Sequence, residues 1–254
     1  MLHPASSSTF RAVTAQRLVV VADSHLGSAP RGDEEAFVAF LDAVPTLGDS
    51  LLLAGDIYDF WFTYRRVIPR RAVQVTAAII QLARRFPVLM LGGNHDRWGD
   101  GFWHEEAGVA FDPWQLELTV GAQRVLAVHG DGLHVEQPTA SFLSRLLASP
   151  AIISTFRALP LELGFRIADR LRHDPDTATL RPDVVADAAA RQESWARKRL
   201  ADEPSLGALI MGHTHREAAV EVEPGRWYLN PGAWLDGHRY ATLSDQGPTL
   251  ERFS

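Results

Sequence analysis

The chain of 254 residues contains no cysteine. This absence excludes disulfides, zinc–thiolate sites, iron–sulfur clusters and thiol nucleophiles, so any bound metal must have oxygen and nitrogen ligands. Long apolar runs are also missing, since none approaches the roughly 18 residues that span a bilayer. Residues 1–16 have no apolar core of signal-peptide length. We therefore expect a flexible tail over residues 1–16 and a cytoplasmic protein, which could still contact the inner face of the membrane peripherally.

An excess of positive charge is absent as well. The 25 Lys and Arg residues are outnumbered by 31 Asp and Glu residues, which gives a net charge of -6. Without bulk attraction to phosphate backbones, a broad nucleic-acid surface is not expected. The length suffices for one α/β domain, here residues 17–254, with a full core.

Short apolar runs recur along the chain, and each ends in a polar cluster. They are too short for typical helices and rich in Val, Leu and Ile, so we interpret them as buried strands. They are "RLVVVADSH", "SLLLAGD", "FPVLMLGGNHD", "RVLAVHGD", "GALIMGHTH" and "RWYLNPGAW".

Helices are predicted between several of these strands. Residues 34–44 and 71–86 have helical periodicity, whereas residues 114–130 alternate around Gly121 and predict a hairpin, so the sheets should be mixed. Residues 133–200 contain no convincing strand. We expect a helical insertion there, which we interpret as a cap.

The polar clusters collect acidic residues and histidines at strand ends. Strands that share a sheet bring their ends to one rim, and residues at i and i+2 point the same way. Residues far apart in the sequence can therefore meet at one site. The clusters contain Asp23, His25, Asp56, Asn94, His95, Asp96, His129, His213 and His215.

These clusters resemble the motifs of the calcineurin-like metallophosphoesterase family. The five blocks occur in the family's order along nearly the whole chain. They are D-x-H at 23–25, G-D-x-x-D at 55–59, G-N-H-D at 93–96, H-G-D at 129–131 and G-H-x-H at 212–215. The resemblance implies an α/β fold, a four-layer αββα sandwich with mixed sheets and a helical cap.

The resemblance also implies two divalent cations bridged by Asp56. One would be held by Asp23, His25, Asp56 and His215, and the other by Asp56, Asn94, His129 and His213. Carboxylate and imidazole ligands suit manganese, iron or zinc, and we expect manganese. Metal coordination lowers the pKa of water from about 15.7 to about 7, which makes hydroxide available for attack on phosphorus.

His95 is not a ligand in this scheme. We expect it to hydrogen-bond the phosphoryl oxygen or to protonate the leaving group, with Asp96 holding its tautomer. Asp59 and Asp131 would orient ligands or cap turns.

Basic residues near the motifs are candidate substrate ligands. Arg65 and Arg66 follow the aromatic run "DFWF", and Arg216 follows the last ligand. They would bind the phosphates of a nucleotide diphosphate, or they are solvated surface arginines. The apolar residues of the cap either pack on the body or shelter acyl chains at a membrane surface.

Within the family, "ADSHLG", "GDIYDFWF", "GHTHR" and "YLNPGAW" resemble the UDP-2,3-diacylglucosamine diphosphatases of lipid A synthesis. That branch's best-known members carry arginine where this chain has His95, so the chain resembles a divergent branch. The implied reaction releases UMP and 2,3-diacylglucosamine 1-phosphate. The alternatives are a phosphodiesterase or phosphomonoesterase for soluble nucleotides, and a non-catalytic metal-binding scaffold. No obligate protein partner is expected.

Overall fold

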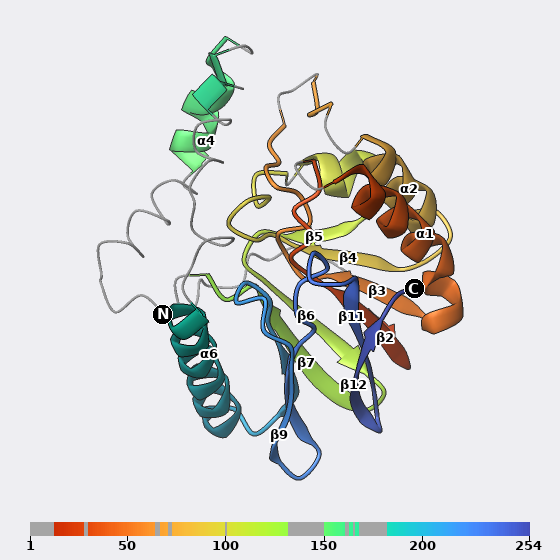
Figure 1. Cartoon of the computed structure of the whole chain (residues 1–254), viewed down its shortest axis with the longest axis vertical. Coiled ribbons are helices and arrows are strands. Elements are labelled where there is room, and N and C mark those ends of the chain that lie inside the picture. Colours follow the sequence, from red (N-terminus) through yellow and green to blue (C-terminus); the bar gives the residue numbers. More distant parts are fainter. Residues whose placement is uncertain are drawn as a thin grey trace.

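Two mixed six-stranded sheets form the centre of the protein (Figure 1). The computed structural model describes residues 13–27, 30–63, 67–70, 73–99, 101–131, 150–160, 163–164, 166–167 and 182–254. In this part of the chain, no helix combines the length and the apolar character needed to cross a membrane.

The first sheet, sheet B, has the strand order β12-β11-β2-β3-β4-β5. Strands β2 to β5 are parallel, and β11 runs antiparallel to its neighbours. The strands are β2 (Arg17–Val21), β3 (Ser50–Leu53), β4 (Val88–Leu91), β5 (Ala110–Asp112), β11 (Arg239–Ser244) and β12 (Gly247–Arg252).

The second sheet, sheet A, has the order β1-β6-β7-β8-β10-β9. Strands β6 and β7 form the predicted hairpin, and β7, β8 and β10 are parallel. The strands are β1 (Thr14–Ala15), β6 (Gln115–Val120), β7 (Gln123–Val128), β8 (Leu206–Ile210), β9 (Ala218–Glu223) and β10 (Arg226–Asn230). The pairing of Thr14 and Ala15 with β6 shows that the flexible tail expected over residues 1–16 ends earlier; residues 1–12 lie outside the described part.

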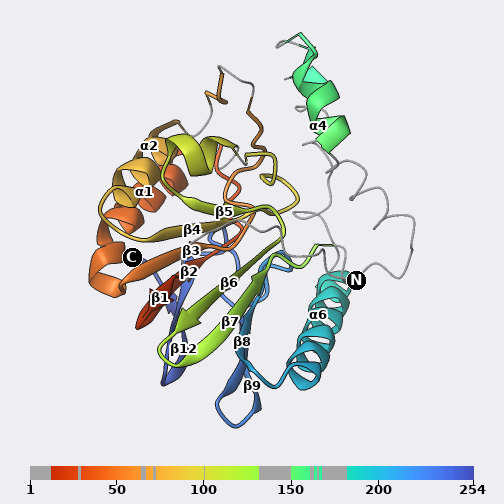
Figure 2. The same cartoon turned by 180° about the vertical axis from the view of Figure 1, so that it is seen from behind.

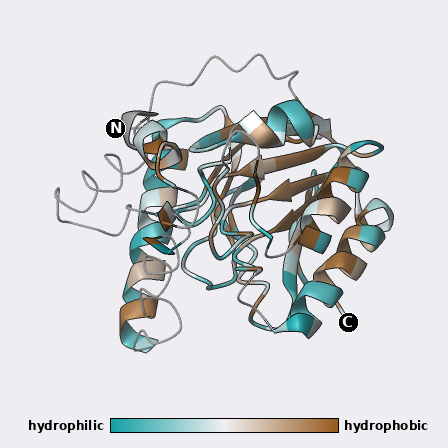
Figure 3. Cartoon of the chain, turned by 90° about the horizontal axis from the view of Figure 1, so that it is seen from above, coloured by the Kyte–Doolittle hydropathy of each residue, from teal (hydrophilic) through white to brown (hydrophobic). Residues whose placement is uncertain are grey.

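Alternating strand residues divide the interior into three apolar layers. On sheet B, Val19 and Val21 face helices α1 (Arg31–Leu47) and α2 (Val73–Ala83), whereas Leu18 and Val20 face sheet A. Figure 3 shows the apolar strands lying between the helices.

Helix α6 (Pro182–Asp202) covers the outer face of sheet A (Figure 2). Its buried residues Ala196 and Leu200 pack against Leu126, Leu209 and Met211. The predicted four-layer αββα sandwich is therefore confirmed. The prediction that residues 133–200 form a cap needs correction at its end, because the apolar stripe of α6 belongs to the body.

Two shorter helices are also described. Helix η1 (Phe102–Glu106) is a π-helix beside β5, and α4 (Pro150–Arg157) lies within the expected insertion. Helix α4 contacts the body through Phe156, whose ring centroid lies 5.1 Å from that of Phe62 and 5.3 Å from that of Trp98. Most other residues from 132 to 181 lie outside the described part of the chain, and so does the rest of the cap prediction.

Candidate metal centre

The polar clusters predicted from sequence meet at one rim of the sandwich. Strands β2, β3 and β4 of sheet B and strands β7 and β8 of sheet A lead into it with their carboxyl ends. Three overlapping groups have ligand atoms within 4.8 Å of one another. These groups are Asp23, His25 and His215; His25, Asp56 and His95; and Asp56, His129 and His213.

Asp56 belongs to two of these groups, as a bridging carboxylate would. It lies after β3, nearly in the middle of the parallel strands, and its side chain is buried. Its Oδ1 accepts a hydrogen bond of 2.9 Å from the backbone N–H of His95, and its Oδ2 lies 3.1 Å from Nε2 of His129. Asn94 lies in the turn just before His95, with an exposed side chain.

Backbone strain is concentrated on the candidate ligands. Six described residues other than glycine have positive φ, with values from 43° to 69°. Five of them are candidate ligands, namely Asp23, His25, Asp56, His213 and His215. Left-handed backbone costs such residues about 1–2 kcal/mol each. Strain of this kind persists where the surroundings impose it, and it is typical of functional sites.

A backbone contact fixes the orientation and tautomer of the His129 imidazole. Its Nδ1 lies 3.1 Å from the carbonyl oxygen of Ala54, which can only accept a hydrogen bond, so Nδ1 carries the proton. In the neutral ring, the lone pair of Nε2 then faces the Asp56 carboxylate. Two lone pairs at this separation repel unless a cation lies between them. The donor set thus fits divalent cations held by nitrogen and oxygen.

The pKa values of the site residues indicate the same need for positive charge. Burial alone would lower the pKa of His129, but the Asp56 carboxylate outweighs it and raises that pKa to about 10. Burial would raise the pKa of Asp56, yet the nearby histidines, His129 first, hold it well below its usual value. The site therefore keeps Asp56 ionised and draws a proton, or an equivalent cation, to its oxygens.

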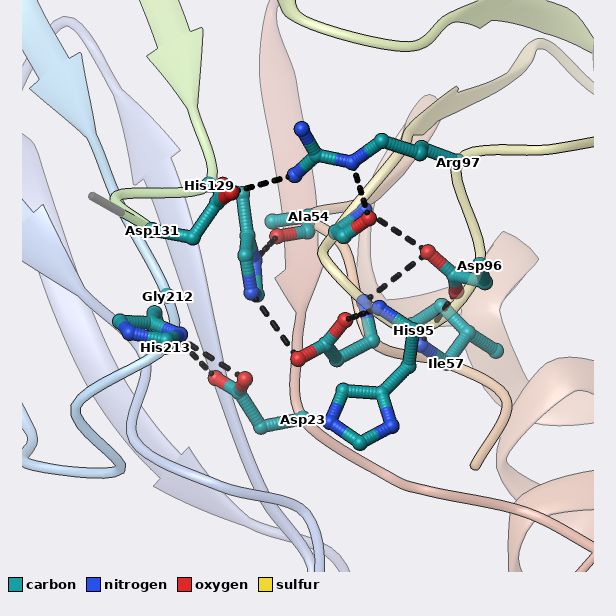
Figure 4. A network of polar contacts seen from close by, with 12 residues as sticks. Asp23, Ala54, Ile57, His95, Asp96, Arg97, His129, Asp131, Gly212 and His213 are labelled. Atoms are coloured by element: carbon teal, nitrogen blue, oxygen red, sulfur yellow. Dashed lines mark hydrogen bonds and ion pairs between the residues drawn. The ribbon is translucent and has the colours of Figure 1, made fainter. Parts of the chain in front are cut away.

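Asp23 and His25 occupy the other end of the centre. Both Asp23 oxygens accept from the backbone N–H of His213, at 2.9 and 3.1 Å (Figure 4). Oδ1 of Asp23 also lies 3.7 Å from Nε2 of His215. Burial raises the pKa of Asp23 to about 6. Burial also lowers the pKa of His25 to about 3, which keeps this imidazole neutral, the form that binds metals.

His95 lies beside the ligands with one nitrogen already engaged. Its Nδ1 lies 2.7 Å from the carbonyl oxygen of Asp59, so Nδ1 donates and Nε2 remains for chemistry. Its ring meets that of His25 edge-on, with centroids 4.8 Å apart. Burial lowers the pKa of His95, but the Asp56 carboxylate and the Asp59 carbonyl outweigh it, so the pKa is raised.

Asp96 has a different role from the one predicted. Its carboxylate accepts hydrogen bonds from four backbone N–H groups, those of Asp56, Ile57, Tyr58 and Gly93, at 2.7–3.3 Å. The Asp59 carbonyl, rather than Asp96, holds the tautomer of His95. Asp96 therefore connects the loop after β3 to the loop after β4. This contact could not be predicted from the sequence, in which Asp56 and Asp96 are 40 residues apart.

Other positioning residues were not identified from the sequence. Asn230 donates to the carbonyl oxygen of Gly212 at 3.0 Å and to Thr214 Oγ1 at 3.2 Å, and Gln192 of α6 donates to the same carbonyl at 3.0 Å. Both amides are buried and fix the loop that carries His213 and His215. The motif "YLNPGAW" contained the signal for Asn230, whereas nothing marked Gln192 within a long polar helix.

The substrate-binding roles of Arg65, Arg66 and Arg216 stay predictions. Arg216 is exposed beside His215, and Arg65 and Arg66 lie outside the described residues. The buried arginine near the centre is Arg97, whose Nη2 lies 2.6 Å from Asp131 Oδ2. Burial would raise the pKa of Asp131, but the Arg97 guanidinium holds it below its usual value.

Carboxylates and imidazoles that converge on one shared aspartate define a metal-dependent hydrolase. The chain belongs to the calcineurin-like phosphoesterase family, whose profile matches residues 16–217. The "UDP-2,3-diacylglucosamine hydrolase" of Sodalis glossinidius is 26% identical over 236 residues, which cover 92% of this chain and 97% of that protein. The protein of the same name from Stutzerimonas stutzeri is 27% identical over 218 residues, covering 81% and 85%.

Solved structures with similar folds are more distant. Vacuolar Protein Sorting 29 from Cryptosporidium parvum is 13% identical, and the alignment covers 93% of this chain and 96% of that one with a TM-score of 0.46. The phosphoesterase Yfce from E. coli is 14% identical, with coverage of 94% and 100% and a TM-score of 0.43.

Proposed function

We propose that the protein hydrolyses the pyrophosphate of UDP-2,3-diacylglucosamine, giving UMP and 2,3-diacylglucosamine 1-phosphate. The observation that carries the hydrolytic part is the position of Asp56, within ligand distance of histidines on both sides of the centre. The relatives named UDP-2,3-diacylglucosamine hydrolase, aligned over most of their length, support the substrate.

Two divalent cations would lower the pKa of a bound water and neutralise charge on the phosphoryl oxygens. In this proposal, Asp23, His25, Asp56 and His215 hold one cation, and Asp56, Asn94, His129 and His213 hold the other. Manganese is the proposed metal, with iron and zinc as alternatives, because the ligands are oxygen and nitrogen without sulfur.

His95 is proposed to act as the acid. The Asp59 carbonyl orients the ring, so the Nε2 atom carries the proton that the leaving group receives. Burial lowers the pKa of His95, but the Asp56 carboxylate and the Asp59 carbonyl outweigh it and raise that pKa, the direction that an acid catalyst requires. The same N–H would donate a hydrogen bond to a phosphoryl oxygen before the transfer.

The acyl chains of this substrate require an apolar surface near the centre. An aromatic cluster occupies this position, because Phe60 and Trp98 belong to the same two loops as Asp59 and His95. Its members are Phe60, Phe62, Trp98, Phe156, Leu159 and Ile167. We propose that this cluster, which joins the body to the insertion, contacts the acyl chains and lets the protein meet the cytoplasmic face of a membrane peripherally.

The test is UMP release from UDP-2,3-diacylglucosamine with added Mn²⁺, compared with a deacylated UDP-sugar and with bis-p-nitrophenyl phosphate. The proposal predicts that the acylated substrate has the highest kcat/KM. Faster turnover of the soluble esters would indicate a phosphodiesterase for nucleotides. Binding of two Mn²⁺ without cleavage of any of the three substrates would indicate a scaffold.

A pair of variants connects the test to the aromatic cluster. Phe156→Ala should lower kcat/KM for the acylated substrate about 10-fold or more and leave bis-p-nitrophenyl phosphate cleavage unchanged, because only the lipid uses the apolar surface. Val184→Ala is the control, since Val184 is an exposed apolar residue of α6. Equal effects of the two variants would contradict the role of the cluster.

A further inference from the structure

Arg97 is a buried cation at the junction of the two sheets. Its side chain is 5% exposed, and it follows the loop after β4 that carries Asn94 and His95. An isolated charge in such a place is costly, so its partners show what it does.

The guanidinium has one contact on each side of the junction. On the sheet B side, Nε donates to the carbonyl oxygen of Gly93 at 2.9 Å, next to Asn94. On the sheet A side, Nη2 donates to Oδ2 of Asp131 at 2.6 Å, two residues after His129. Figure 4 shows Arg97 reaching from the loop of Asp96 toward Asp131, above His129.

A third contact restricts the plane of the guanidinium. Its Cζ lies 4.5 Å from the ring centroid of Trp114, in the connection from β5 of sheet B to β6 of sheet A. The Gly93 peptide is held from its other end too, because its N–H donates to Asp96 Oδ1 at 2.7 Å. The Gly93 peptide that precedes Asn94 is therefore held at both ends. Through Arg97 it is also connected to Asp131, in the loop of His129.

The ion pair is not well explained as a simple stabilising contact. Among the described residues, Nη1 of Arg97 is buried and has no hydrogen-bond partner. Leaving such a donor unpaired is unfavourable, and apolar side chains often replace buried ion pairs without loss of stability. The feature that an apolar pair would not reproduce is the fixed distance between the two loops.

We propose that the Arg97–Asp131 pair is a positioning device for one of the two cation sites, the site formed by Asp56, Asn94, His129 and His213. The pair sets the separation between Asn94 on one sheet and His129 on the other. The site formed by Asp23, His25, Asp56 and His215 does not use either loop for its other ligands, so it keeps its affinity. This inference rests on the proposed metal centre but not on the proposed substrate.

The test measures cation binding to the metal-free full chain without substrate. Calorimetric titration with Mn²⁺, together with the spin-coupled signal of paired Mn²⁺, separates the two binding events. We call filling of the site with Asp23 and His25 the first event, and filling of the site with Asn94 and His129 the second. Arg97→Met and Asp131→Asn should each weaken the second event 10–100-fold, the range found for residues that orient ligands, and change the first less than about 3-fold. The double variant should be no weaker than Arg97→Met alone, because both changes break one contact.

Arg97→Lys gives a matched comparison, because it keeps the charge but cannot contact Gly93 and Asp131 with a rigid fork. Its second affinity should lie between those of the wild type and Arg97→Met. Arg124→Met is the control, since Arg124 pairs with Glu117 at 2.9 Å and with Glu203 away from the centre. Asp131→Asn preserves side-chain shape, so it keeps the test valid if Arg97→Met does not fold.

Two results would overturn the proposal: unchanged second-site affinity in both variants, or equal weakening of both binding events. Failure of the proposed function would look different. A wild-type protein that binds two Mn²⁺ but does not cleave the acylated substrate refutes the substrate and leaves this inference open to the same measurement. A wild-type protein that binds fewer than two ions refutes the centre itself.

Discussion

Nε2 of His129 lies 3.1 Å from Oδ2 of Asp56, and both side chains are almost fully buried, with 1% and 3% of their surface exposed. The histidine reaches this position from sheet A and the aspartate from sheet B. A neutral imidazole and a carboxylate at this separation need a positive charge between them. This relationship makes Asp56 the residue on which the centre most depends.

Asp56→Asn should therefore abolish binding of the second cation and weaken the first. We expect a loss of turnover of at least about 100-fold. The amide of asparagine is neutral and has one oxygen, so it cannot replace a charged carboxylate that bridges two cations. Metal content after dialysis and turnover of bis-p-nitrophenyl phosphate measure both effects. Asp236→Asn, at an exposed carboxylate, is the control. An Asp56→Asn protein that keeps two tightly bound ions would refute the bridging role.

His95→Ala should reduce turnover while both ions stay bound. General acid catalysis contributes about 10²–10⁴-fold, and the loss should be largest for the poor leaving group of a natural phosphoester. A p-nitrophenolate leaving group needs little protonation, so its cleavage should fall much less. His104→Ala, at an exposed histidine of η1, should change neither. An equal loss for both leaving groups would exclude the acid role.

Asp96→Ala should lower the free energy of unfolding, because Asp96 has a structural role. The change leaves four buried backbone N–H groups without their acceptor. We expect the free energy of unfolding to fall by about 2–4 kcal/mol. Urea denaturation of the metal-free protein gives this number. Normal stability combined with lost activity would instead support a direct catalytic role for Asp96.

Tyr228 should produce a measurable loss of stability at alkaline pH. Burial raises the pKa of its hydroxyl from 10.0 to about 12, although a hydrogen bond with Asn230 acts in the opposite direction. The native state holds the proton more tightly, so this stabilisation is present below about pH 10 and disappears as pH rises through 12. The difference corresponds to roughly 3 kcal/mol.

Tyr228→Phe should remove that dependence. Urea denaturation at several pH values from 9 to 12 should show the free energy of unfolding of the wild type falling relative to that of the variant as pH rises. Parallel curves for the two proteins would show that Tyr228 ionises without effect on folding.

Removal of metal should destabilise the wild-type protein. Cations that bind only the native state add about 2.7 kcal/mol when their concentration is 100 times Kd. For a chain of this size, that energy corresponds to a Tm difference of about 5–10 °C. Scanning calorimetry with and without chelator measures the difference. Asp56→Asn should show a smaller one, and equal differences in both proteins would mean that the chelated ions bind elsewhere.

The strands that carry the ligands could be predicted because each is an apolar run that ends in polar residues. Strands β9, β11 and β12 lack such endings, and β9 alternates between half-buried and exposed residues, so no comparable pattern marked them. Helix α6 was predicted as a helix but given the wrong neighbour. Periodicity identifies an apolar face, here Ala196 and Leu200, without identifying the surface that covers it.

The site was predictable to the extent that its ligands are motif residues. The contacts that orient them were harder to find, because they join backbone atoms to side chains far away in the sequence. The Asp59 carbonyl that holds His95 is an example, since a carbonyl has no sequence signature. The Arg97–Asp131 pair is another, because a charge beside a motif is most often a surface charge.

The ends of β7 and β8 are tied directly, because the N–H of Gly212 donates to the carbonyl oxygen of His129 at 3.0 Å. These neighbouring parallel strands are nevertheless joined in sequence only through the long segment between Asp131 and Leu206. Only the part of that segment before α6 is free to change in length and composition, because α6 packs on β7 and β8 and its Gln192 holds the loop of His213 and His215. Under the proposed function, exchange of that part alone would alter the surface offered to the acyl chains and leave the hydrolytic centre as it is.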